Sequence, residues 1–476
     1  MISRVTWGAT WNKSPTTPKS ETTTDLMSGL VSAAGILAEL VGRFRTGASS
    51  RVETSMCESV PGPDNGPRAP GAGGALAGLR VIEISSFAAA PLGAMTLAQL
   101  GADVIRVDPI GGAADHARWP RTADGASLYW AGLNKGKRSV TIDFRSPRGQ
   151  ELITRLITAP GQDRGILLTN AVGRRFLEHE VLRQHRPDLI QVVISGHRDG
   201  SPAVDYTVNA ALGFPWLTGP EELAAPVNHV LPAWDVACGL HAAIGILAAE
   251  RRRRIHGTGG LVSVALYDVA LAMVGNLGLL AEAQVNHVQR ERIGNYLYGG
   301  FGRDFRTRDQ HTIMVVALTA RHWNDLMKVT ALAGTVDGLA GILGADFSTD
   351  DDRFRYREVI AGLLRPWFES RDADEIERQL AGTSVLFSRY RSVTDLVGDG
   401  LPGLLAHPMM TEVDQPGIGR FLAPGSPLEF AGTSALPARA APVLGEHTAD
   451  VLAEILGLSG AQLGELGREH VIGEAS

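Results

Sequence analysis

Two short apolar segments separated by a helical pattern constrain the fold of this chain most strongly. Leu79–Ile84 (LRVIEI) and Asp103–Val107 (DVIRV) have the composition of buried strands. Between them, Pro91–Leu100 has helical spacing of its apolar residues and stops at Gly101. Parallel strands need a crossover of this length, usually a helix, so the three segments form a βαβ unit. This unit predicts a parallel sheet that is buried on both faces.

The alternation of strands and helices continues as far as residue 266. Further buried strands are predicted at Ser139–Ile142, Gly165–Thr169, Leu189–Ser195 and Leu261–Leu266. Helical patterns occupy Pro147–Ile157, which has a proline at its first turn, and Val236–Arg254. Such alternation is typical of an α/β protein with helices on both faces of the sheet. We therefore predict a doubly wound parallel-sheet domain of the Rossmann-like kind.

The pattern changes after about residue 290, and this change predicts a second domain. Residues 294–305 (GNYLYGGFGRDF) form a loop rich in glycine and aromatic residues, and His311–Ala317 has the composition of a strand. Helical patterns with charged faces follow to about residue 398. We predict a large α/β domain at 76–290, a smaller α+β domain at 291–400, and a return to the large domain at 401–476 through a last helix, Glu446–Leu456.

The first 75 residues differ in composition from the rest. Residues 1–24 are rich in Ser, Thr and Lys, and residues 59–74 are rich in Pro and Gly, which is typical of poorly ordered, low-complexity segments. Between them, Leu26–Val41 is apolar, but it is short for a membrane span and contains Glu39. We expect an amphipathic helix there, without a catalytic role. The stretch also lacks the basic flank and cleavage site of a signal peptide.

Composition excludes several classes of protein. The formal net charge is −6 with both signs interspersed, so no nucleic-acid partner is expected. No membrane association is expected either, because the apolar stretch Leu26–Val41 is short and contains Glu39. The only cysteines are Cys57 and Cys238, which excludes a disulfide framework and a Cys-based zinc site and favours the cytoplasm. The histidines lack the H-x-x-x-H and H-E-x-x-H spacings, so we predict no metal site. No G-x-S-x-G elbow marks an α/β-hydrolase.

The first strand-to-helix turn gives little support for a dinucleotide site. This turn, SSFAAAPLG at residues 85–93, lacks the G-x-G-x-x-G fingerprint. Asp108 ends the second strand, where a dinucleotide-binding protein often holds a ribose hydroxyl. Without the glycines this position alone is a weak signal, and we do not expect an NAD site.

Two aspartates are candidates for chemistry. Asp235, in HVLPAWDVACGLH, opens an apolar helix, where the helix dipole and the free N–H groups of the first turn favour a carboxylate. Asp205 begins another apolar helical run, thirty positions earlier (235 − 205). Both aspartates are also consistent with simple helix caps. The sequence alone does not show that they meet.

A basic cluster is the third candidate. Lys135, Lys137 and Arg138 lie just before a predicted strand, which suits a phosphate-bearing ligand. A solvated run of charges explains the cluster equally well. The run Arg251–Arg254 complements the dipole at the end of a helix, and we assign it no function.

Four stretches, in order, resemble the formyl-CoA-transferase type of CoA transferase, known as family III. They are LAGLRVIEISSFAAAPLGAMTLAQLGADVIRVDPIGG, LNKGKRSVTIDFRSPRGQELITRLI, the segment from Asp205 through WDVACGLHAAIGILAAERRRR, and PVLGEHTADVLAEILG. They cover most of the chain from Leu76 to about Ile472. The resemblance implies an acyl-CoA substrate, no tightly bound cofactor and an interlocked homodimer.

The resemblance also implies roles for individual residues. The family's nucleophile is the aspartate that opens the helix before an apolar G-I-L-A-A run, and Asp235 matches it. An acidic residue about thirty positions earlier shares that active site, and Asp205 matches it. Val204 stands where related racemases have a proton-transferring histidine, which counts against racemase chemistry. The glycine-rich loop that closes over the intermediate corresponds to Tyr298, Gly299, Gly300 and Gly302.

The family's CoA-binding elements fall on seven residues of this chain. They are Phe87, Ala88, Asn134, Lys137, Arg138, Asn170 and Ala171. The family often has glutamine at the position of Ala88 and a basic residue at the position of Pro109. Two contacts with CoA that the family makes are therefore not expected in this chain.

Further stretches are similar to a branch of the family that moves CoA between the two carboxyl groups of 2-methylfumarate. They are AAPLGAMTLAQLGADVIRVDPIGG, YWAGLNKGKRS, DYTVN, VNHVLPAWD and GNYLYGGFGRDF. This similarity implies an intramolecular CoA transferase that works through an aspartyl anhydride and an aspartyl-CoA thioester. Two alternatives stay open: an intermolecular transferase between an acyl-CoA and a free acid, and a CoA-binding protein without catalysis.

Overall fold

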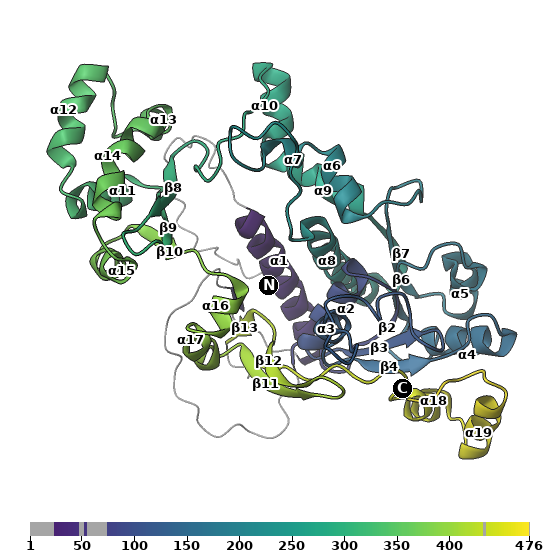
Figure 1. Ribbon diagram of the computed structural model, residues 1–476. Coiled ribbons are helices and arrows are strands. Elements are labelled where there is room, and N and C mark those ends of the chain that lie inside the picture. Colours follow the sequence, from purple (N-terminus) through teal and green to yellow (C-terminus); the bar gives the residue numbers. More distant parts are fainter. Residues whose placement is uncertain (1–22, 47–51, 55–73, 432–434, 476) are drawn as a thin grey trace, which may run out of the picture. The chain divides into compact units, whose positions relative to one another are not determined.

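The computed structural model describes residues 23–46, 52–54, 74–431 and 435–475 (Figure 1). These residues form two compact units. The large unit takes in the described parts of 23–215, 228–288 and 393–476, and the small unit those of 216–227 and 289–392.

A six-stranded parallel sheet forms the centre of the large unit. The strands are β2 (Arg80–Ile84), β3 (Asp103–Asp108), β4 (Arg138–Thr141), β5 (Ile166–Thr169), β6 (Ile190–Ser195) and β7 (Gly260–Ala265). Their order is β4–β3–β2–β5–β6–β7, and all neighbours are parallel. The chain starts in the middle at β2, adds β3 and β4 on one side, and then adds β5, β6 and β7 on the other. This is the Rossmann strand order, so the predicted doubly wound sheet is confirmed.

Helices cover both faces of this sheet. One face carries α2 (Ala89–Gln99), α8 (Ala233–His256) and α9 (Leu266–Asn276), with α1 (Thr23–Thr46) packed against α8. The other face carries α4 (Pro147–Ile157), α5 (His179–His185), α18 (Thr448–Leu456) and α19 (Gly460–Arg468). Side chains of β2 alternate between the faces: Val81 packs with the first set, and Ile82 and Ile84 with the second. Burial of apolar side chains on both faces stabilises the parallel sheet.

Shorter elements complete this part of the chain. They are β1 (Val52–Thr54), which pairs with β13 (Leu428–Phe430), the hairpin of β11 (Met410–Gln415) and β12 (Gly419–Pro424), the single turn η1 (Arg175–Leu177), and the helices α3 (Leu128–Leu133), α6 (Asp205–Ala211), α10 (Leu279–Asn286), α16 (Val393–Val397) and α17 (Leu401–Ala406). The short helix α7 (Phe214–Leu217) contains the boundary in sequence between the two units. The helix predicted at Leu26–Val41 is confirmed as part of α1. Ala34, Ala38 and Val41 of this helix are buried.

The close crossing of α2 and α8 depends on two glycines. A Cβ on Gly239 would lie 2.4 Å from the carbonyl oxygen of Ala89, and a Cβ on Gly93 would lie 2.6 Å from that of Gly239. Real Cβ atoms do not approach backbone this closely. The first turn of α2 therefore lies against α8 one helical turn after Asp235.

We expect Gly239→Ala to lower the free energy of unfolding by about 1–3 kcal/mol, because the new methyl group forces the two helix backbones apart. Urea denaturation measures the change. Gly362→Ala is the control, since a Cβ at that helical position meets nothing within 4 Å. It should be neutral or slightly stabilising, because alanine is the better helix former. Equal stability of the Gly239→Ala and wild-type proteins would contradict the tight crossing.

The small unit combines an antiparallel sheet with helices. The sheet has the order β10–β9–β8, formed by β8 (Phe301–Arg306), β9 (Thr312–Ala317) and β10 (Leu386–Arg389). The helices are α11 (Ala320–Val329), α12 (Ala333–Leu343), α13 (Asp350–Arg355), α14 (Arg357–Glu369) and α15 (Ala373–Ala381). Phe305 of β8 stacks on Phe368 of α14 at 4.3 Å between ring centroids, inside the core of this unit.

The glycine-rich loop predicted at 298–302 ends earlier than expected. Gly302 lies in β8, where it pairs with Val316. A Cβ at Gly302 would come within 3.1 Å of Leu297 Cβ and within 3.0 Å of the Val316 side chain. This glycine therefore permits close packing in a strand. The sequence pattern did not distinguish that use of glycine from a flexible loop.

Two further predictions about the C-terminal part are wrong. Residues 401–476 were expected to contain one helix as their regular element, but they also form the β11–β12 hairpin. The helix predicted as the last one, observed as α18, is followed by α19. In α19 Ser459 and Gln462 form a capping box, in which each side chain bonds the other residue's backbone N–H.

Some helices have the length and composition of membrane spans. Among the described residues, α8 meets that test alone, and the bent pairs α9–α10 and α11–α12 meet it if each pair counts as one span. In α8, 61% of the apolar stretch is buried inside the protein, against α1, α2 and the sheet. The apolar composition of α8 is therefore explained by its place in the core.

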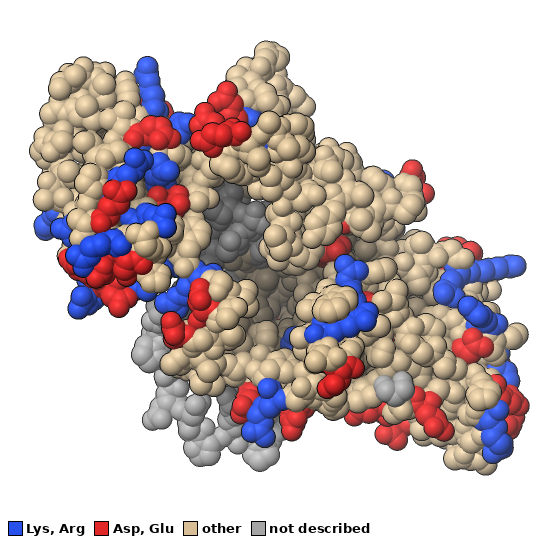
Figure 2. Space-filling model, viewed as in Figure 1, with Lys and Arg blue, Asp and Glu red and all other residues tan. Residues whose placement is uncertain are grey.

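Charged side chains of both signs share the molecular surface. On the face drawn in Figure 2, acidic and basic residues are intermixed, and no broad area carries basic residues alone. This distribution agrees with the interspersed charges of the sequence. The absence of a nucleic-acid partner stays a prediction.

Candidate active site

The carboxyl ends of β2 and β5 are joined by hydrogen bonds. The Asn170 side chain, just after β5, accepts a bond from the Ser86 N–H at 3.1 Å and donates one to the Ser86 carbonyl at 2.8 Å. The N–H of Ala171 donates to Thr169 Oγ1 at 3.0 Å. Strand order reverses between β2 and β5, and ligands of doubly wound proteins bind at such a switch point. Two predicted CoA-binding residues, Asn170 and Ala171, therefore lie at this switch point, and their contact with CoA stays a prediction.

The turn between β2 and α2 brings Phe87 and Ala88 to the same edge. Phe87 has a φ of 67°, which is rare for a residue with a side chain, and the residue is 46% exposed. Strained backbone of this kind is concentrated at functional sites. Ala88 occupies the N-cap position of α2 and makes no side-chain cap. The start of α2 thus presents backbone N–H groups where the family often has a glutamine side chain.

Asp235 lies in the first turn of α8 but does not cap it. The helix starts at Ala233 with Pro232 in the N-cap position, so the predicted start at Val236 and the cap role of Asp235 are wrong. The Asp235 carboxyl group is half-buried and makes no hydrogen bond with any described residue. It is therefore available for chemistry.

Asp205 caps α8 instead. Its Oδ2 accepts hydrogen bonds from the N–H of Trp234 at 2.7 Å and of Asp235 at 3.1 Å. The N–H groups before and after these two donate to backbone carbonyls, so the first turn is satisfied without the Asp235 side chain. The two aspartates therefore meet, and Asp205 fixes the backbone that carries Asp235.

Burial and charge raise the pKa of Asp235. Its pKa rises from 3.8 to about 6, chiefly because the carboxyl group is buried and further because Asp205 is negative, with a partial offset from Arg118. Burial also raises the pKa of Asp205, against the effect of its two N–H donors. The prediction that the helix terminus would favour ionised Asp235 is wrong in direction, since Asp205 takes the N–H groups. With a pKa of about 6, Asp235 is still about nine-tenths ionised at pH 7.

The Trp234 side chain anchors the start of α8. Its Nε1–H donates to Asn209 Oδ1 at 3.2 Å, and Asn209 Nδ2 donates to Asn228 Oδ1 at 3.1 Å. The Trp234 ring also packs against Phe214, with 5.2 Å between centroids. These contacts join α8 to α6 and so fix the positions of Asp205 and Asp235 relative to each other.

The structure adds Arg118 and Tyr129, which the sequence did not single out. The Arg118 guanidinium lies 5.5 Å from the Phe87 ring and 5.2 Å from the Tyr129 ring. Both residues are close enough to Asp235 for mutual electrostatic effects: Arg118 lowers its pKa, and the Asp235 charge adds to the burial that raises the pKa of Tyr129. Tyr129 opens the stretch YWAGLNKGKRS, but no sequence signal relates it to Asp235.

Asn134 and Lys137 belong to a buried ionic network. Lys137 Nζ pairs with Glu83 at 2.7 Å and donates to Asn134 Oδ1 at 2.8 Å. Asn134 also accepts from Arg106, which pairs with Asp108 at 2.9 Å. All five side chains are at most 4% exposed. The NAD-type role considered for Asp108 finds no support, because Arg106 occupies its carboxylate.

The basic cluster is not a solvated run of charges. Lys135 and Lys137 are 6% and 4% exposed, and burial lowers the pKa of each to about 8. Arg138 points toward the start of β3, where it pairs with Asp103 at 2.6 Å and with Glu454 at 2.7 Å. The side chains of Asn134, Lys137 and Arg138 therefore all bond to other residues of the protein. Their contact with CoA stays a prediction.

We expect Lys137→Met to lower the free energy of unfolding by up to about 3–5 kcal/mol, because the buried Glu83 carboxylate loses its 2.7 Å ion pair and keeps only Arg106 at 3.8 Å and the Ser85 hydroxyl. Urea denaturation of the single variant and of the Glu83→Gln/Lys137→Met double variant measures the effect, and the double variant should recover most of the loss. A Lys137→Met protein of wild-type stability with a raised KM for acyl-CoA would show that the lysine serves CoA binding instead.

The remaining predicted residues lie in the small unit. Tyr298 packs against Phe354 at 5.1 Å and against the Arg290 guanidinium at 3.6 Å, both measured to ring centroids. Gly299 has a φ of 72°, a conformation that side chains disfavour, and Gly300 follows it before β8 begins. Asp235 and Asp205 belong to the large unit, so the closing role of this loop stays a prediction.

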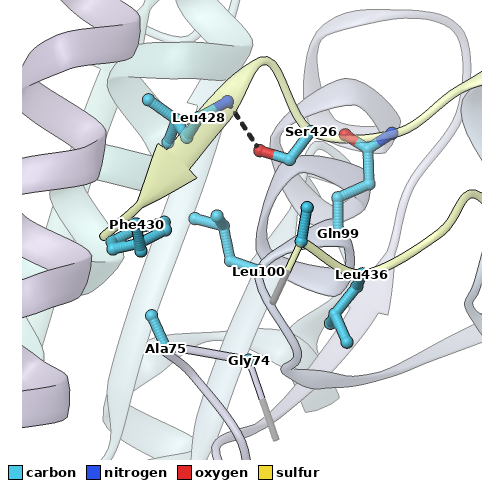
Figure 3. A pocket seen from close by; sticks show the side chains of 9 residues that line it. Gly74, Ala75, Gln99, Leu100, Ser426, Leu428, Phe430 and Leu436 are labelled. Carbon is cyan, nitrogen blue, oxygen red and sulfur yellow. Dashed lines mark hydrogen bonds between the residues drawn. The ribbon is translucent and has the colours of Figure 1, made fainter. Parts of the chain in front are cut away.

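A shallow crevice elsewhere in the large unit is not a catalytic site. Figure 3 shows its mainly apolar lining, which includes Leu100, Phe430 and Leu436. Its polar side chains, Gln99 and Ser426, bond the Pro424 carbonyl at 3.2 Å and the Leu428 N–H at 3.1 Å. The crevice lies at the end of α2 away from Phe87, and its lining residues include no titratable side chain.

Other nucleophiles and metal ligands near Asp235 can be assessed from the described residues. Cys238 follows Asp235 by one helical turn, but burial and the Asp235 charge raise the pKa of its thiol to about 12, so it stays protonated. Cys57 lies outside the described residues. Within the described ranges no three His, Cys, Asp or Glu side chains gather as a metal site would require.

Comparison with known proteins relates this geometry to a family. The model of CoA-transferase family III matches residues 76–448. The chain belongs to this family. It is 52% identical over 400 residues to the 2-methylfumaryl-CoA isomerase of Chloroflexus aurantiacus, covering 84% of this chain and 98% of that relative. The family predicted from the motifs is confirmed, as is the similarity to its isomerase branch.

More distant relatives match a similar length of this chain. The succinyl-CoA:mesaconate CoA-transferase of Haloarcula hispanica is 28% identical over 397 residues, which cover 80% of this chain and 96% of that protein. The crystal structure of a CAIB/BAIF family protein from Brucella suis superposes with a TM-score of 0.64 at 24% identity, covering 80% of this chain and 99% of that one. This likeness confirms the fold.

Proposed function

We propose that this protein is an intramolecular CoA transferase, which converts 2-methylfumaryl-CoA (mesaconyl-C1-CoA) into 3-methylfumaryl-CoA (mesaconyl-C4-CoA). One observation carries the proposal: the Asp235 carboxyl group has no hydrogen-bond partner among the described residues, while Asp205 holds its backbone at the carboxyl edge of the sheet. The name of the relative that is 52% identical over 98% of its length supports the choice of substrate.

The first half of the reaction moves CoA onto the enzyme. The Asp235 carboxylate attacks the C1 thioester carbonyl, and the C–S bond breaks to release CoA thiolate and leave a mixed anhydride. The thiolate then attacks the aspartyl carbonyl of the anhydride. The C1 carboxylate leaves, so that free 2-methylfumarate lies beside an aspartyl-CoA thioester.

The second half returns CoA to the other end of the acid. The free dicarboxylate turns, and its C4 carboxylate attacks the aspartyl thioester and expels the thiolate. The thiolate attacks the C4 carbonyl of the new anhydride and releases Asp235 as a carboxylate. No proton is gained or lost overall. A pKa of about 6 suits this cycle, because the carboxylate is ionised at pH 7 yet more basic than an ordinary aspartate.

Other residues are proposed to position the reactants. Phe87, Ala88, Asn170 and Ala171 surround the switch point and are placed to receive CoA, which enters as part of the substrate. The loop that includes Gly299 and Gly300 is proposed to exclude water from the anhydride, since hydrolysis would waste the intermediate.

We further propose a cytoplasmic homodimer. Exposed apolar side chains on α16 and α17 support an interface: Val393 is 79%, Val397 53% and Leu405 59% exposed. Light scattering coupled to gel filtration tests the oligomeric state, and a mass near twice 50.6 kDa is expected.

The decisive experiment gives the enzyme mesaconyl-C1-CoA alone. An intramolecular transferase forms the C4 isomer without any added acid, and chromatography separates the two thioesters. Labelled free mesaconate, added in a second reaction, should stay out of the product. Isomer formation that requires free acid, or label in the product, would favour intermolecular transfer, as in the relative named succinyl-CoA:mesaconate CoA-transferase. No turnover at all would favour a non-catalytic CoA-binding protein.

A further inference from the structure

Arg118 is held beside the candidate nucleophile without an anionic partner. Its guanidinium lies over the rings of Phe87 and Tyr129, at 5.5 and 5.2 Å from their centroids. The side chain is exposed and makes no hydrogen bond or ion pair with any residue that the structure describes. Arg106 and Arg138 of the same unit are both paired with carboxylates. A stacked guanidinium with unused donors is an anion-binding group.

Tyr129 offers a second donor on the same side of Asp235. Its hydroxyl has no hydrogen-bond partner within the described part of the chain, and its ring is half-buried against Arg118. Phe87 lies two residues before α2, whose first turn contacts α8 at Gly239, one turn after Asp235. The two donors and the nucleophile therefore border one space at the carboxyl edge of the sheet.

The position of these donors selects the kind of anion. The thioester carbonyl must reach Asp235, and the whole pantetheine arm then separates this point from the phosphates of CoA. The anion that lies next to the reacting carbonyl is a second carboxylate on the acyl group. We propose that Arg118 and Tyr129 form a subsite for the free carboxylate of a dicarboxylyl-CoA, an inference that rests on the proposed function.

This carboxylate subsite also explains how an intramolecular transferase keeps its acid. While CoA is bound to Asp235, the dicarboxylate is free and carries one carboxylate at each end. The fork of Arg118 binds either carboxylate in a bidentate manner. When Arg118 releases one carboxylate and binds the other, the acid turns. The carboxylate that was released can then reach the aspartyl thioester.

The test compares two substrates that differ only at C4, where one has a charged carboxylate and the other a neutral methyl ester. Mesaconyl-C1-CoA and its C4 methyl ester are each incubated with wild-type, Arg118→Gln and Tyr129→Phe enzymes, and hydroxylamine traps the Asp235 adduct for mass spectrometry. We expect Arg118→Gln to slow trapping from the charged substrate by roughly 10-fold to 100-fold, because a charge-assisted bond is lost, and Tyr129→Phe by about 3-fold to 10-fold. Trapping from the ester should change less than about 3-fold.

Arg121→Gln is the matched control, because Arg121 lies on the same connection but packs against Trp119. An equal loss with both substrates, or no loss with either, would overturn the subsite. Calorimetric binding of free 2-methylfumarate and its monomethyl ester to the same proteins gives a readout that needs no turnover. Arg118→Gln should weaken the diacid selectively. A wild-type enzyme that forms no adduct contradicts the proposed function, whereas unchanged diacid binding in Arg118→Gln contradicts the subsite.

Discussion

Asp235→Ala and Asp235→Asn enzymes are expected to lose isomerisation by roughly 10⁴-fold or more, which is the scale of removing a covalent nucleophile. Neither replacement can form the anhydride or the aspartyl-CoA thioester. The rate of C4-thioester formation from mesaconyl-C1-CoA measures the loss. With mesaconyl-C1-CoA present, hydroxylamine should react with the adduct on Asp235 of the wild-type protein and leave both variants unmodified.

The Asp235→Asn protein should remain folded and gain stability at neutral pH. The folded-state pKa of Asp235 is raised from 3.8 to about 6, so folding disfavours its charged form. Its contribution to stability therefore falls as pH rises between these values, and a neutral asparagine does not suffer this loss. Urea denaturation at pH 5 and pH 8 separates inactivity from misfolding. An Asp235→Asn enzyme with normal turnover, or a CoA adduct found on another residue, would reject the mechanism.

The sheet could be predicted because parallel strands that are buried on both faces are mainly apolar. Strands such as β5 (ILLT) satisfy that condition, and their boundaries agree with the predictions within a residue or two. The small unit and the C-terminal hairpin do not satisfy it. In β8, the segment FGRDFR mixes glycine, charge and aromatic residues, since its pairing with β9 is antiparallel and only one face is buried.

The site could be predicted only in part, because its geometry depends on tertiary contacts. Asp205 and Asp235 were identified by resemblance, but which of them caps α8 is decided by a contact across thirty positions. Lys137 and Arg138 are neighbours in sequence, yet their side chains have different partners. One enters the buried network with Glu83, and the other pairs with Asp103. Sequence adjacency therefore suggested one basic site where the structure has two separate ion pairs.

Arg118 was missed for a related reason. It lies in the long connection between β3 and α3, where no periodic pattern constrains the backbone. Its significance comes from what surrounds it: two aromatic rings, a nearby carboxyl group, and no partner among the described residues. In the described structure most buried charges, including those of Arg106 and Lys137, are paired.

Asp205 allows a test that separates positioning from proton transfer. Asp205→Ala removes the acceptor for the Trp234 and Asp235 N–H groups and is expected to lower kcat/KM by at least about 10²-fold, because the first turn of α8 shifts. Asp205→Asn keeps a side-chain oxygen as acceptor and should retain activity to within about 10-fold. If Asp205 instead transferred a proton, both variants would be equally impaired.

The pH dependence of the wild-type and Asp205→Asn enzymes gives a second measurement of how Asp205 affects Asp235. Asp235 must be ionised to attack, so the kcat/KM of the wild type should fall as pH drops through the Asp235 pKa of about 6. Asp205→Asn removes a negative charge that raises this pKa, and its activity should therefore persist to lower pH. A profile from pH 4.5 to 8.5 measures the shift. An unchanged midpoint in Asp205→Asn would show that the two carboxyl groups do not interact, and the paired-aspartate site would have to be abandoned.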